Sequence, residues 1–529
     1  MKALIYILTA GCLLTLQSCK KFLDSEPQDF ISPVNYYENE AQLNTALNAV
    51  YDPLGQPNVY GDRMLGRMGL DADEAYFTRA TELTGVSVYD VSVTDPFINN
   101  FWRELYDGIN RANLLLENIN KATDISDANR NAIKGEALFL RAYYHFLLVS
   151  NFKDVPLVLA TLPNAENTNV SRTPAIEVYD QIIADMTEAE ALVKPITTIG
   201  FGGRVSKSAV RGVLARVCLS AAGHPVNDTK RYTDARDWAL KVISDTEAAH
   251  SLNPDYSRVF INYAEEKYDV KESILEVEFW GNRLDAYREG GRVANNNGIR
   301  TSNEDLGYTY GFIATTGKLF NLYQKNPDNS SPDLRRDWSI APYRWNNTTK
   351  VFHTATQIYE RDCGKFRREY ELLTPKGKND TPQNFPLLRF SDVLLMYAEA
   401  ENQLNGPTVS AYNAINQVRR RAYGKLLPGA INITTADLSG LTKSSFLAAI
   451  KDERSRELSF ECLRKRDLVR WNDFLPAMKE VLSQFDTDAP PALRFGRLAF
   501  NNATQRDELW PIPSREFGLN RNLTQNEGW

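Results

Sequence analysis

Hydrophobic positions along much of the chain recur every three or four residues, the spacing of one face of an amphipathic α-helix. The clearest example runs from Trp102 to Ile119. A second helix is predicted to start from a cap at Ser126 or Asp127 and to continue to about Val149, with small residues among bulky aromatic ones. Small residues opposite large ones let two antiparallel helices pack closely. We therefore expect a helix pair here.

The same pattern returns elsewhere in the chain. Thr173 and Pro174 predict an N-cap followed by a proline at the first helical position, and Ser206 predicts another N-cap. Helix pairs at intervals of roughly 35 residues are typical of a tetratricopeptide-like array, in which each pair buries its open face on the next. We predict a mostly α protein on a tetratricopeptide-like helical repeat scaffold, with a later pair folding back onto it. The further helical segments are 39–51, 174–186, 209–219, 232–243, 393–402 and 410–421.

The stretch 270–386 differs from the helical segments around it. Residues 274–279 predict a short strand, but the rest is loop-rich and dense in asparagine, tryptophan and tyrosine. Long irregular segments inside a compact protein are usually functional or disordered, and this aromatic content argues against disorder. We expect little β structure and a loop-rich, aromatic-rich insertion that is more than a linker.

The start of the chain predicts where the protein resides. An apolar run over residues 3–16 is shorter than the ~20 residues of a membrane-spanning helix and fits a secretory signal peptide. It ends in Leu-Gln-Ser-Cys at positions 16–19, which resembles a bacterial lipobox. We expect residues 1–18 to be a lipoprotein signal peptide and Cys19 to be lipidated, so that acyl chains anchor the mature protein at a membrane. The alternative is an ordinary cleaved signal with an incidental cysteine.

Composition and charge limit the kinds of protein and of binding partner that remain possible. Hydrophobic residues make up 43% of the 529 and charged residues 24%, which is typical of a globular protein with a substantial core. A net charge of −6 offers no basic patch, so we expect no nucleic-acid partner. Cys218, Cys363 and Cys462 are too far apart and odd in number for a disulfide framework, and we expect buried free thiols at Cys218 and Cys462. The four histidines lack metal-ligand spacing, and we expect neither a metal nor a cofactor.

Several blocks of sequence, in a fixed order, point to one family. They lie at 19–24, 106–113, 140–144, 154–157, 203–207, 392–400, 453–461, 509–513 and 522–526. Together they resemble the SusD/RagB family, the surface glycan-binding lipoproteins of Bacteroidetes. One departure is Cys462, where the family usually has glycine, and we expect this side chain to crowd a close helix contact. Arg464, Asp467 and Arg470 are expected to form internal ion pairs at helical spacing rather than a ligand site.

The resemblance implies both an organisation and a function. An N-terminal SusD-like region with the helix pairs would cover 19–269, and a C-terminal region, 270–529, would include the insertion (270–386) and the returning helices. Family members cap a SusC-like TonB-dependent transporter in the outer membrane and help deliver oligosaccharides to it. The implied function is a surface-exposed, lipid-anchored protein that binds oligo- or polysaccharide and is not an enzyme.

Two alternatives stay open. RagB-type relatives handle peptides, and the matching blocks are scaffold that cannot separate the two kinds of cargo. The sequence contains no Gly-x-Ser-x-Gly, His-Glu-x-x-His or phosphate-binding loop. A glycoside hydrolase, however, needs only two carboxylates, which sequence does not exclude.

Sugar recognition has a physical profile that can be sought in the sequence. The apolar faces of pyranose rings pack on aromatic side chains, and their hydroxyls need polar partners. The resemblance places such residues in loops before the first repeat helices and in the insertion; the alternative is that most of the aromatics fill a secondary core. The acidic cluster 71–74 lacks an EF-hand pattern and is expected to be a solvated loop or helix cap. The candidate ligand-binding residues are Asp73, Tyr89, Trp280, Tyr287, Arg292, Asn296, Tyr308, Tyr310, Trp338 and Trp345.

Overall fold

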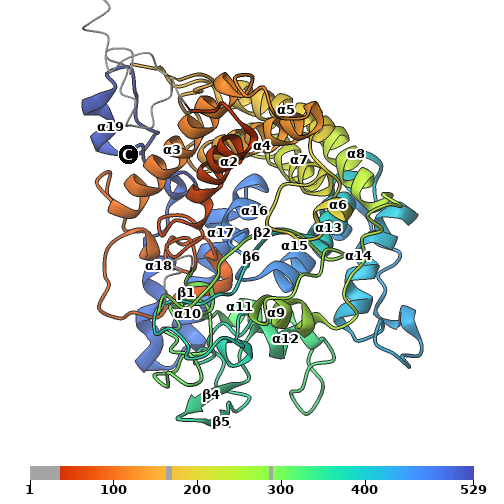
Figure 1. Ribbon diagram of the computed structural model, residues 1–529. Coiled ribbons are helices and arrows are strands. Elements are labelled where there is room, and N and C mark those ends of the chain that lie inside the picture. The colour runs from red at the N-terminus through yellow and green to blue at the C-terminus, as the bar shows by residue number, and fades with distance from the viewer. Residues whose placement is uncertain (1–35, 162–168, 285–289) are drawn as a thin grey trace, which may run out of the picture.

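The computed structural model describes residues 36–161, 169–284 and 290–529 (Figure 1). The predicted signal peptide, Cys19 and Tyr287 lie outside the described residues. The protein is mostly helical, as predicted. Helices before the insertion are α2 (Glu40–Gly55), α3 (Pro96–Asn118), α4 (Asp127–Phe152), α5 (Ala175–Leu192), α6 (Ile196–Ile199), α7 (Lys207–Ala222), α8 (Arg231–Ile243) and α9 (Tyr256–Ala264). Helices after it are α13 (Phe390–Asn405), α14 (Val409–Ala422), α15 (Lys443–Leu458), α16 (Arg464–Arg470), α17 (Phe474–Asp488), α18 (Leu498–Asn502) and α19 (Ser514–Leu519).

The long helices form a layered array, visible along the top of Figure 1. Helix α3 packs on α4, α4 on α5, α5 on α7, and α7 on α8. Gly108 of α3 permits a close approach, because a Cβ there would lie 2.5 Å from the ring of Tyr144 in α4. Helix α13 packs on α8 although well over a hundred residues separate them, so the later helix pair does fold back onto the array. The tetratricopeptide-like prediction is confirmed.

Two of the three predicted helix caps are confirmed. The hydroxyls of Ser126 and Ser206 accept hydrogen bonds from backbone N–H groups three residues along, each at 3.2 Å. The cap at Thr173 is wrong, because α5 begins one residue later and Pro174 occupies the N-cap position. A proline side chain accepts no hydrogen bond, and Asp154 serves instead, with its Oδ1 2.8 Å from the backbone N of Ala175.

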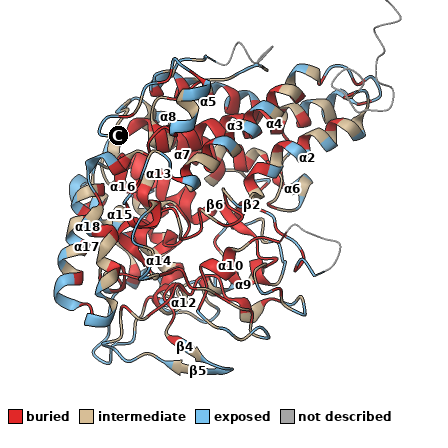
Figure 2. Cartoon of the chain, turned by 90° about the vertical axis from the view of Figure 1, so that its left-hand side faces the viewer, coloured by how far each residue is buried: buried red, intermediate tan, exposed pale blue. Residues whose placement is uncertain are grey.

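The insertion begins and ends at one pair of strands. Strand β2 (Ser273–Val277) pairs antiparallel with β6 (Phe385–Arg389), and Val277 lies opposite Phe385. The strand predicted at 274–279 is therefore confirmed. Between these strands the described chain contains only short elements, and the projecting β4–β5 hairpin is largely exposed (Figure 2). They are α10 (Val293–Asn296), β3 (Ile313–Thr315), α11 (Gly317–Leu322), α12 (Leu334–Ser339), β4 (Tyr343–Asn346) and β5 (Thr349–Phe352).

Buried ion pairs join the insertion to the helices that follow it. The Glu457 carboxylate on α15 lies 2.8 Å from Arg389 at the end of β6 and 2.6 Å from Arg421 on α14. Arg335 on α12 lies 3.1 Å from the same carboxylate, and all four side chains are fully buried. Burial alone would raise the pKa of Glu457, but the three guanidiniums outweigh it and hold the pKa well below its usual range. Asp333, Glu272, Glu453, Glu461 and Lys365 complete this cluster, which we call the Glu457 network.

The C-terminal signature also carries the expected internal ion pairs. Arg470 lies 2.9 Å from Asp467, one helical turn away. Arg464 makes its shortest ion pair with Asp73, at 2.7 Å, far away in sequence.

Cys218, Cys363 and Cys462 are buried free thiols. Cys462 has a φ of 59°, in the left-handed region that favours glycine. Its Sγ donates to the backbone O of Met64 at 3.3 Å. We expected glycine to be preferred here because a side chain would crowd a helix contact. The structure gives a different reason, which is that the backbone has a left-handed conformation at this position.

The Glu457 network predicts a large stability loss when its central charge is removed. Glu457→Gln leaves three buried guanidiniums without their shared carboxylate, and breaking such a pair costs about 3–5 kcal/mol of the free energy of unfolding. Equilibrium unfolding in urea at neutral pH measures this. The matched control is Glu188→Gln, which removes a half-exposed partner of Lys134 and changes the same free energy by less than about 1 kcal/mol. Equal losses in the two variants would contradict the prediction.

Candidate ligand-binding cleft

An open cleft of about 710 Å³ lies beside the β4–β5 hairpin, which is at the bottom of Figure 1. The part that belongs to the insertion includes residues 300–302 and 308–310, the β4–β5 hairpin and residues 353–362. Residues just after β1 (Ala75–Phe77) and residues of the 3₁₀ helix Pro491–Arg497 complete the walls. The cleft therefore forms where the insertion meets segments from both ends of the chain.

Strand pairing joins the wall that follows β1 to the wall that the insertion supplies. Strand β1 pairs antiparallel with β3, and the contact continues past the strands. The Thr78 hydroxyl donates to the backbone O of Gly311 at 2.7 Å, and the Arg79 guanidinium donates to the backbone O of Tyr310 at 2.9 Å. Gly311 has a φ of 56°, which a side chain would make unfavourable. These contacts set the position of the tyrosines that precede Gly311.

Three aromatic rings in the cleft are packed from behind and half exposed. The rings of Tyr308 and Tyr310 meet edge to face with centroids 5.0 Å apart, and Tyr310 stacks on Phe312 at 5.3 Å. On the hairpin, Trp345 packs against Tyr343 with centroids 5.3 Å apart. Rings held in this way lose little conformational freedom when a ligand covers their open side.

Polar and charged side chains line the cleft between the rings. Asp362 accepts hydrogen bonds from the backbone N of Arg300 at 2.9 Å and from its guanidinium at 3.2 Å. Burial raises the pKa of Asp362, and the Arg300 charge only partly offsets this. Burial also lowers the pKa of His353 to about 4, helped by Arg361 and Arg344, so this imidazole is neutral at pH 7. Gln357 and Glu360 supply further polar groups.

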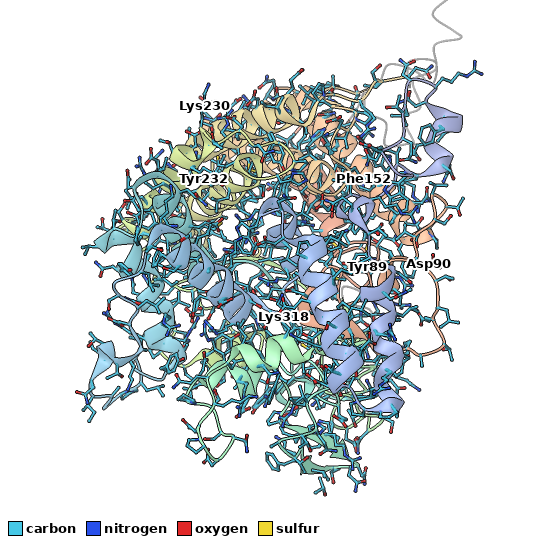
Figure 3. The ribbon with its side chains drawn as sticks, turned by 180° about the vertical axis from the view of Figure 1, so that it is seen from behind. Tyr89, Asp90, Phe152, Lys230, Tyr232 and Lys318 are labelled. Atoms are coloured by element: carbon cyan, nitrogen blue, oxygen red, sulfur yellow. The ribbon has the colours of Figure 1, made fainter. Side chains whose placement is uncertain are left out.

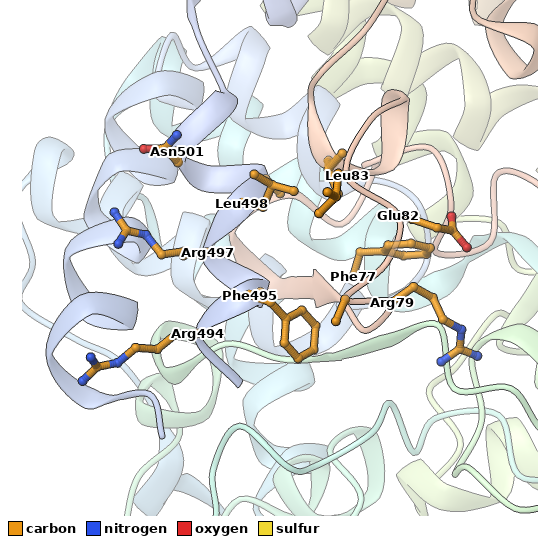
Figure 4. Close-up of a pocket in the computed structure, with 13 residues that line it drawn as sticks. Phe77, Arg79, Glu82, Leu83, Arg494, Phe495, Arg497, Leu498 and Asn501 are labelled. Atoms are coloured by element: carbon orange, nitrogen blue, oxygen red, sulfur yellow. The ribbon is translucent and has the colours of Figure 1, made fainter. Parts of the chain in front are cut away.

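A smaller, more apolar cavity of about 360 Å³ adjoins the cleft (Figure 4). Phe77, Leu83 and Leu498 surround it, whereas Arg494 and Arg497 extend away from these apolar side chains. Arg79 and Phe495 line both the cavity and the cleft. The two hollows are therefore neighbours on one face of the molecule.

The cleft brings together three of the ten candidate residues, Tyr308, Tyr310 and Trp345. Trp338 is covered by the Arg367 guanidinium, 3.9 Å from a ring centroid. Trp280 is 44% exposed, beside Phe279, which lines a separate cavity of about 530 Å³.

Two more candidates lie together away from the cleft. Arg292 is 3.4 Å from Asp62, and the fully buried Asn296 donates to the same carboxylate at 2.8 Å. Asn296 therefore serves internal packing, and we leave it out of the proposed binding surface.

Asp73 and Tyr89 are interior residues. Asp73 lies 2.7 Å from Arg464 and 3.1 Å from Lys318, and the Tyr89 hydroxyl donates to the backbone O of Gly69. Tyr89 and Lys318 are marked in the view from behind (Figure 3). Of the two expectations for the acidic cluster, the solvated loop is wrong, because Asp71, Asp73 and Glu74 are each under 5% exposed. The segment Ala72–Glu74 is instead a short 3₁₀ helix with Asp71 at its N-cap position, although the Asp71 side chain makes no capping hydrogen bond. The partners of Asp73 and Glu74, among them Arg464 and Ser455, lie hundreds of residues along the chain, where no local pattern reveals them.

Sequence reasoning missed most of the polar lining of the cleft. Arg79 and Arg300 are single charged residues in loops, without a motif to mark them. Arg344 had a usable signal, since it directly precedes the candidate Trp345 in a predicted binding segment. Asp362 and Glu360 had none.

No helix in residues 36–161, 169–284 or 290–529 is both long and apolar enough to cross a membrane. Within the same ranges, no three side chains of His, Cys, Asp or Glu gather in a way that could hold a metal ion.

The fold and the cleft define a helical-repeat protein with a ligand-sized recess in an inserted, loop-rich region. Two family models match consecutive parts of the chain: the SusD family over residues 271–529, and a family described as starch-binding and associating with the outer membrane over residues 21–219. The chain belongs to the SusD/RagB family. The boundary predicted at residue 270 stays a prediction.

Similar proteins match over nearly their whole length. SusD-like protein P25 of Formosa agariphila is 26% identical, with 96% of this chain and 95% of that protein covered. The crystal structure of a SusD homologue from Bacteroides thetaiotaomicron superimposes with a TM-score of 0.84 at 27% identity, covering 94% of this chain and 98% of the other. A laminarin-binding SusD-like protein shares the fold, with a TM-score of 0.72 at 23% identity over 93% of this chain and 100% of that one.

The surroundings of Asp73 predict a pH-dependent stability contribution. Burial alone would raise its pKa, but Arg464 and Lys318 lower it to about 2. Because this lies below the ordinary value near 4, the carboxylate stabilises the folded state above pH ~4 and loses its effect as the pH falls through the folded pKa. Asp73→Asn should lower the free energy of unfolding by about 3 kcal/mol at pH 6, and by about half as much at pH 3.

Urea unfolding at the two pH values measures this difference. The control is Asp90→Asn, at an exposed carboxylate marked in Figure 3, which should change stability little at either pH. An Asp73→Asn variant with unchanged stability but lost ligand binding would return Asp73 to the binding surface.

Proposed function

We propose that the protein is a cell-surface lipoprotein that binds oligo- or polysaccharide in the cleft and passes it, uncleaved, to a SusC-like TonB-dependent transporter. The observation that carries the proposal is the set of half-exposed rings of Tyr308, Tyr310 and Trp345 around one polar recess. Pyranose rings present apolar faces to such platforms, while their hydroxyls need the guanidinium, amide and carboxylate groups found between them. Membership of a family with starch- and laminarin-binding relatives supports the same ligand class.

The open form of the cleft suits cargo that must be released. Each stacked ring contributes about 0.5–1.5 kcal/mol beyond its area. A few such contacts give micromolar to millimolar dissociation constants, about 4–8 kcal/mol of binding free energy. Tighter binding would slow transfer to the next protein, since affinity differences lie mostly in the dissociation rate.

Family membership supports the proposed partner and the proposed membrane association. The N-terminal family model describes association with the outer membrane. The resemblance to the SusD/RagB family implies a TonB-dependent transporter as the partner. The helical array supplies a broad surface for such a partner. Co-purification with a transporter after mild detergent extraction tests the pairing, and repeated recovery of this protein alone would argue against it.

Removing a stacking ring should weaken glycan binding without destabilising the fold. Trp345→Ala and Tyr308→Ala should each raise the dissociation constant at least about fivefold, since each removes about 1 kcal/mol of contact. Titration calorimetry against the best binder from a panel of plant, algal and microbial polysaccharides measures this. The matched control is Phe352→Ala, on the same hairpin as Trp345 but 69% exposed and outside the cleft lining.

The alternatives predict different results in the same assay. Normal binding in both ring variants would place the glycan site elsewhere, and an early melting transition would mean that the rings serve the core. Binding of peptides but not glycans would favour the RagB-type function. New reducing ends from a bound glycan, abolished by Glu360→Gln, would favour a glycoside hydrolase that uses Glu360 and Asp362.

The lipid anchor is tested at Cys19. Because only acyl chains on this residue would hold the protein at the membrane, Cys19→Ala should leave a folded protein in the soluble fraction and abolish incorporation of labelled palmitate. Ser18→Thr keeps the cysteine and is the control. Membrane retention of the Cys19→Ala protein in a strain without the transporter would contradict lipidation.

A further inference from the structure

The cleft holds more arginine than its carboxylates neutralise. Three arginines line it, Arg79, Arg300 and Arg344, against two carboxylates, Asp362 and Glu360. The whole chain carries a net charge of −6, so this local balance is opposite in sign to the protein. Arginine also differs from lysine in presenting a planar fork of donors that matches carboxylate and sulfate groups.

Arg344 is the most available of these cations. It lies on β4, between Tyr343 and Trp345, and its residue is exposed. Across the described ranges its guanidinium makes no hydrogen bond and no ion pair. Its charge nevertheless contributes to lowering the pKa of His353, so it acts on the inside of the cleft.

Arg79 is held in the wall by neutral groups alone. Its guanidinium donates to the Thr78 hydroxyl at 3.2 Å and to the backbone O of Tyr310 at 2.9 Å, and it stacks over Phe312 at 4.6 Å. No carboxylate of the described residues lies within ion-pair distance of it. Burial lowers the pKa of Arg79, and so does the neighbouring charge of Arg300. The charges of Glu82 and Asp362 raise this pKa, but they offset the lowering only in part. A half-buried cation next to another cation gains from an added anion.

The two carboxylates do not cancel this excess. Asp362 is engaged by both the backbone and the guanidinium of Arg300. Glu360 is the remaining acid of the lining, and among the described residues it makes no ion pair with Arg79 or Arg344. With His353 neutral at pH 7, one positive charge remains in the cleft, beside the rings of Tyr308 and Trp345.

We propose that the glycan recognised in this cleft is acidic, carrying carboxylate or sulfate groups that bind Arg344 and Arg79 while sugar rings stack on Tyr308 and Trp345. This inference rests on the proposed function and names its ligand class. The fork of Arg344 donates two parallel hydrogen bonds to one anionic group, and Arg79 adds charge from the wall. A neutral glycan would use the rings but leave the arginines without an anion.

The test compares paired ligands that carry or lack the anionic groups on the same sugar backbone. One pair is a galacturonate hexasaccharide and its fully methyl-esterified form; the other is a κ-carrageenan oligosaccharide and its desulfated form. Titration calorimetry should show at least about tenfold tighter binding of one charged member than of its neutral partner, as expected when charged hydrogen bonds are gained. The two pairs separate carboxylate from sulfate. Raising the salt concentration should weaken only the charged member's binding.

Variants assign the effect to the cleft. Arg344→Gln should weaken binding of the preferred charged ligand about fivefold to tenfold and leave its neutral partner unchanged. The control is Arg515→Gln, which removes an equally exposed positive charge on α19, far from the cleft lining. Trp345→Ala should weaken both members of the pair.

Each other outcome is decisive. Equal binding of charged and neutral partners, or binding of laminarihexaose alone, overturns the acidic-ligand inference, and the proposed function stands if Trp345→Ala still weakens binding. Equal losses in Arg344→Gln and Arg515→Gln would mean general electrostatics and overturn the assignment to the cleft. If no glycan binds, the proposed function fails and this inference fails with it.

Discussion

Three arginines and one glutamate carry charge into a part of the protein that water does not reach. Glu457 faces Arg335 from the insertion, Arg389 from strand β6 and Arg421 from the returning helices. Burying such ions costs several kcal/mol each, and their attraction repays this only when the geometry is closely kept. None of these elements can shift without separating a desolvated pair. The network therefore fixes the insertion on the helical array, and every wall of the cleft that the insertion supplies depends on it.

The cleft itself combines rigid backing with open faces. Tyr310 is held by its own backbone contact to Arg79 and by the ring of Phe312, and Trp345 is held by Tyr343. Their exposed sides need no rearrangement to accept a ligand, so little of the binding free energy is lost in ordering them. In the proposed function, the arginines select by charge, while the rings contribute contacts that depend little on which sugar is bound.

Local patterns in the sequence predicted what local forces determine. Helix periodicity, the serine caps and strand β2 are decided by neighbours within a few residues, and these predictions are confirmed. The cap at Thr173 failed because Asp154, from another segment, replaces it. The same dependence on local pattern applies to the candidate site. The aromatic content of the insertion pointed to Tyr308 and Trp345. Asp73 was expected to be exposed, because its partner Arg464 is close to it in space but far away in sequence. Arg79 and Arg300 reach the cleft through tertiary folding that no spacing records.

The pairing of β2 with β6 means that the insertion leaves the helical array and returns to it at adjacent positions, Val277 and Phe385. A segment whose two ends join the rest of the chain at adjacent positions can be exchanged as one unit, or cassette. Homologous recombination between relatives could thus replace, in one event, the part of the cleft that the insertion supplies, while Arg79 and Phe495 stay behind with the rest of the chain. The condition is that the incoming cassette keeps the cations equivalent to Arg335 and Lys365, since their carboxylate partners stay behind in α15 and the segment just after it. Cargo specificity could then evolve separately from the machinery of delivery.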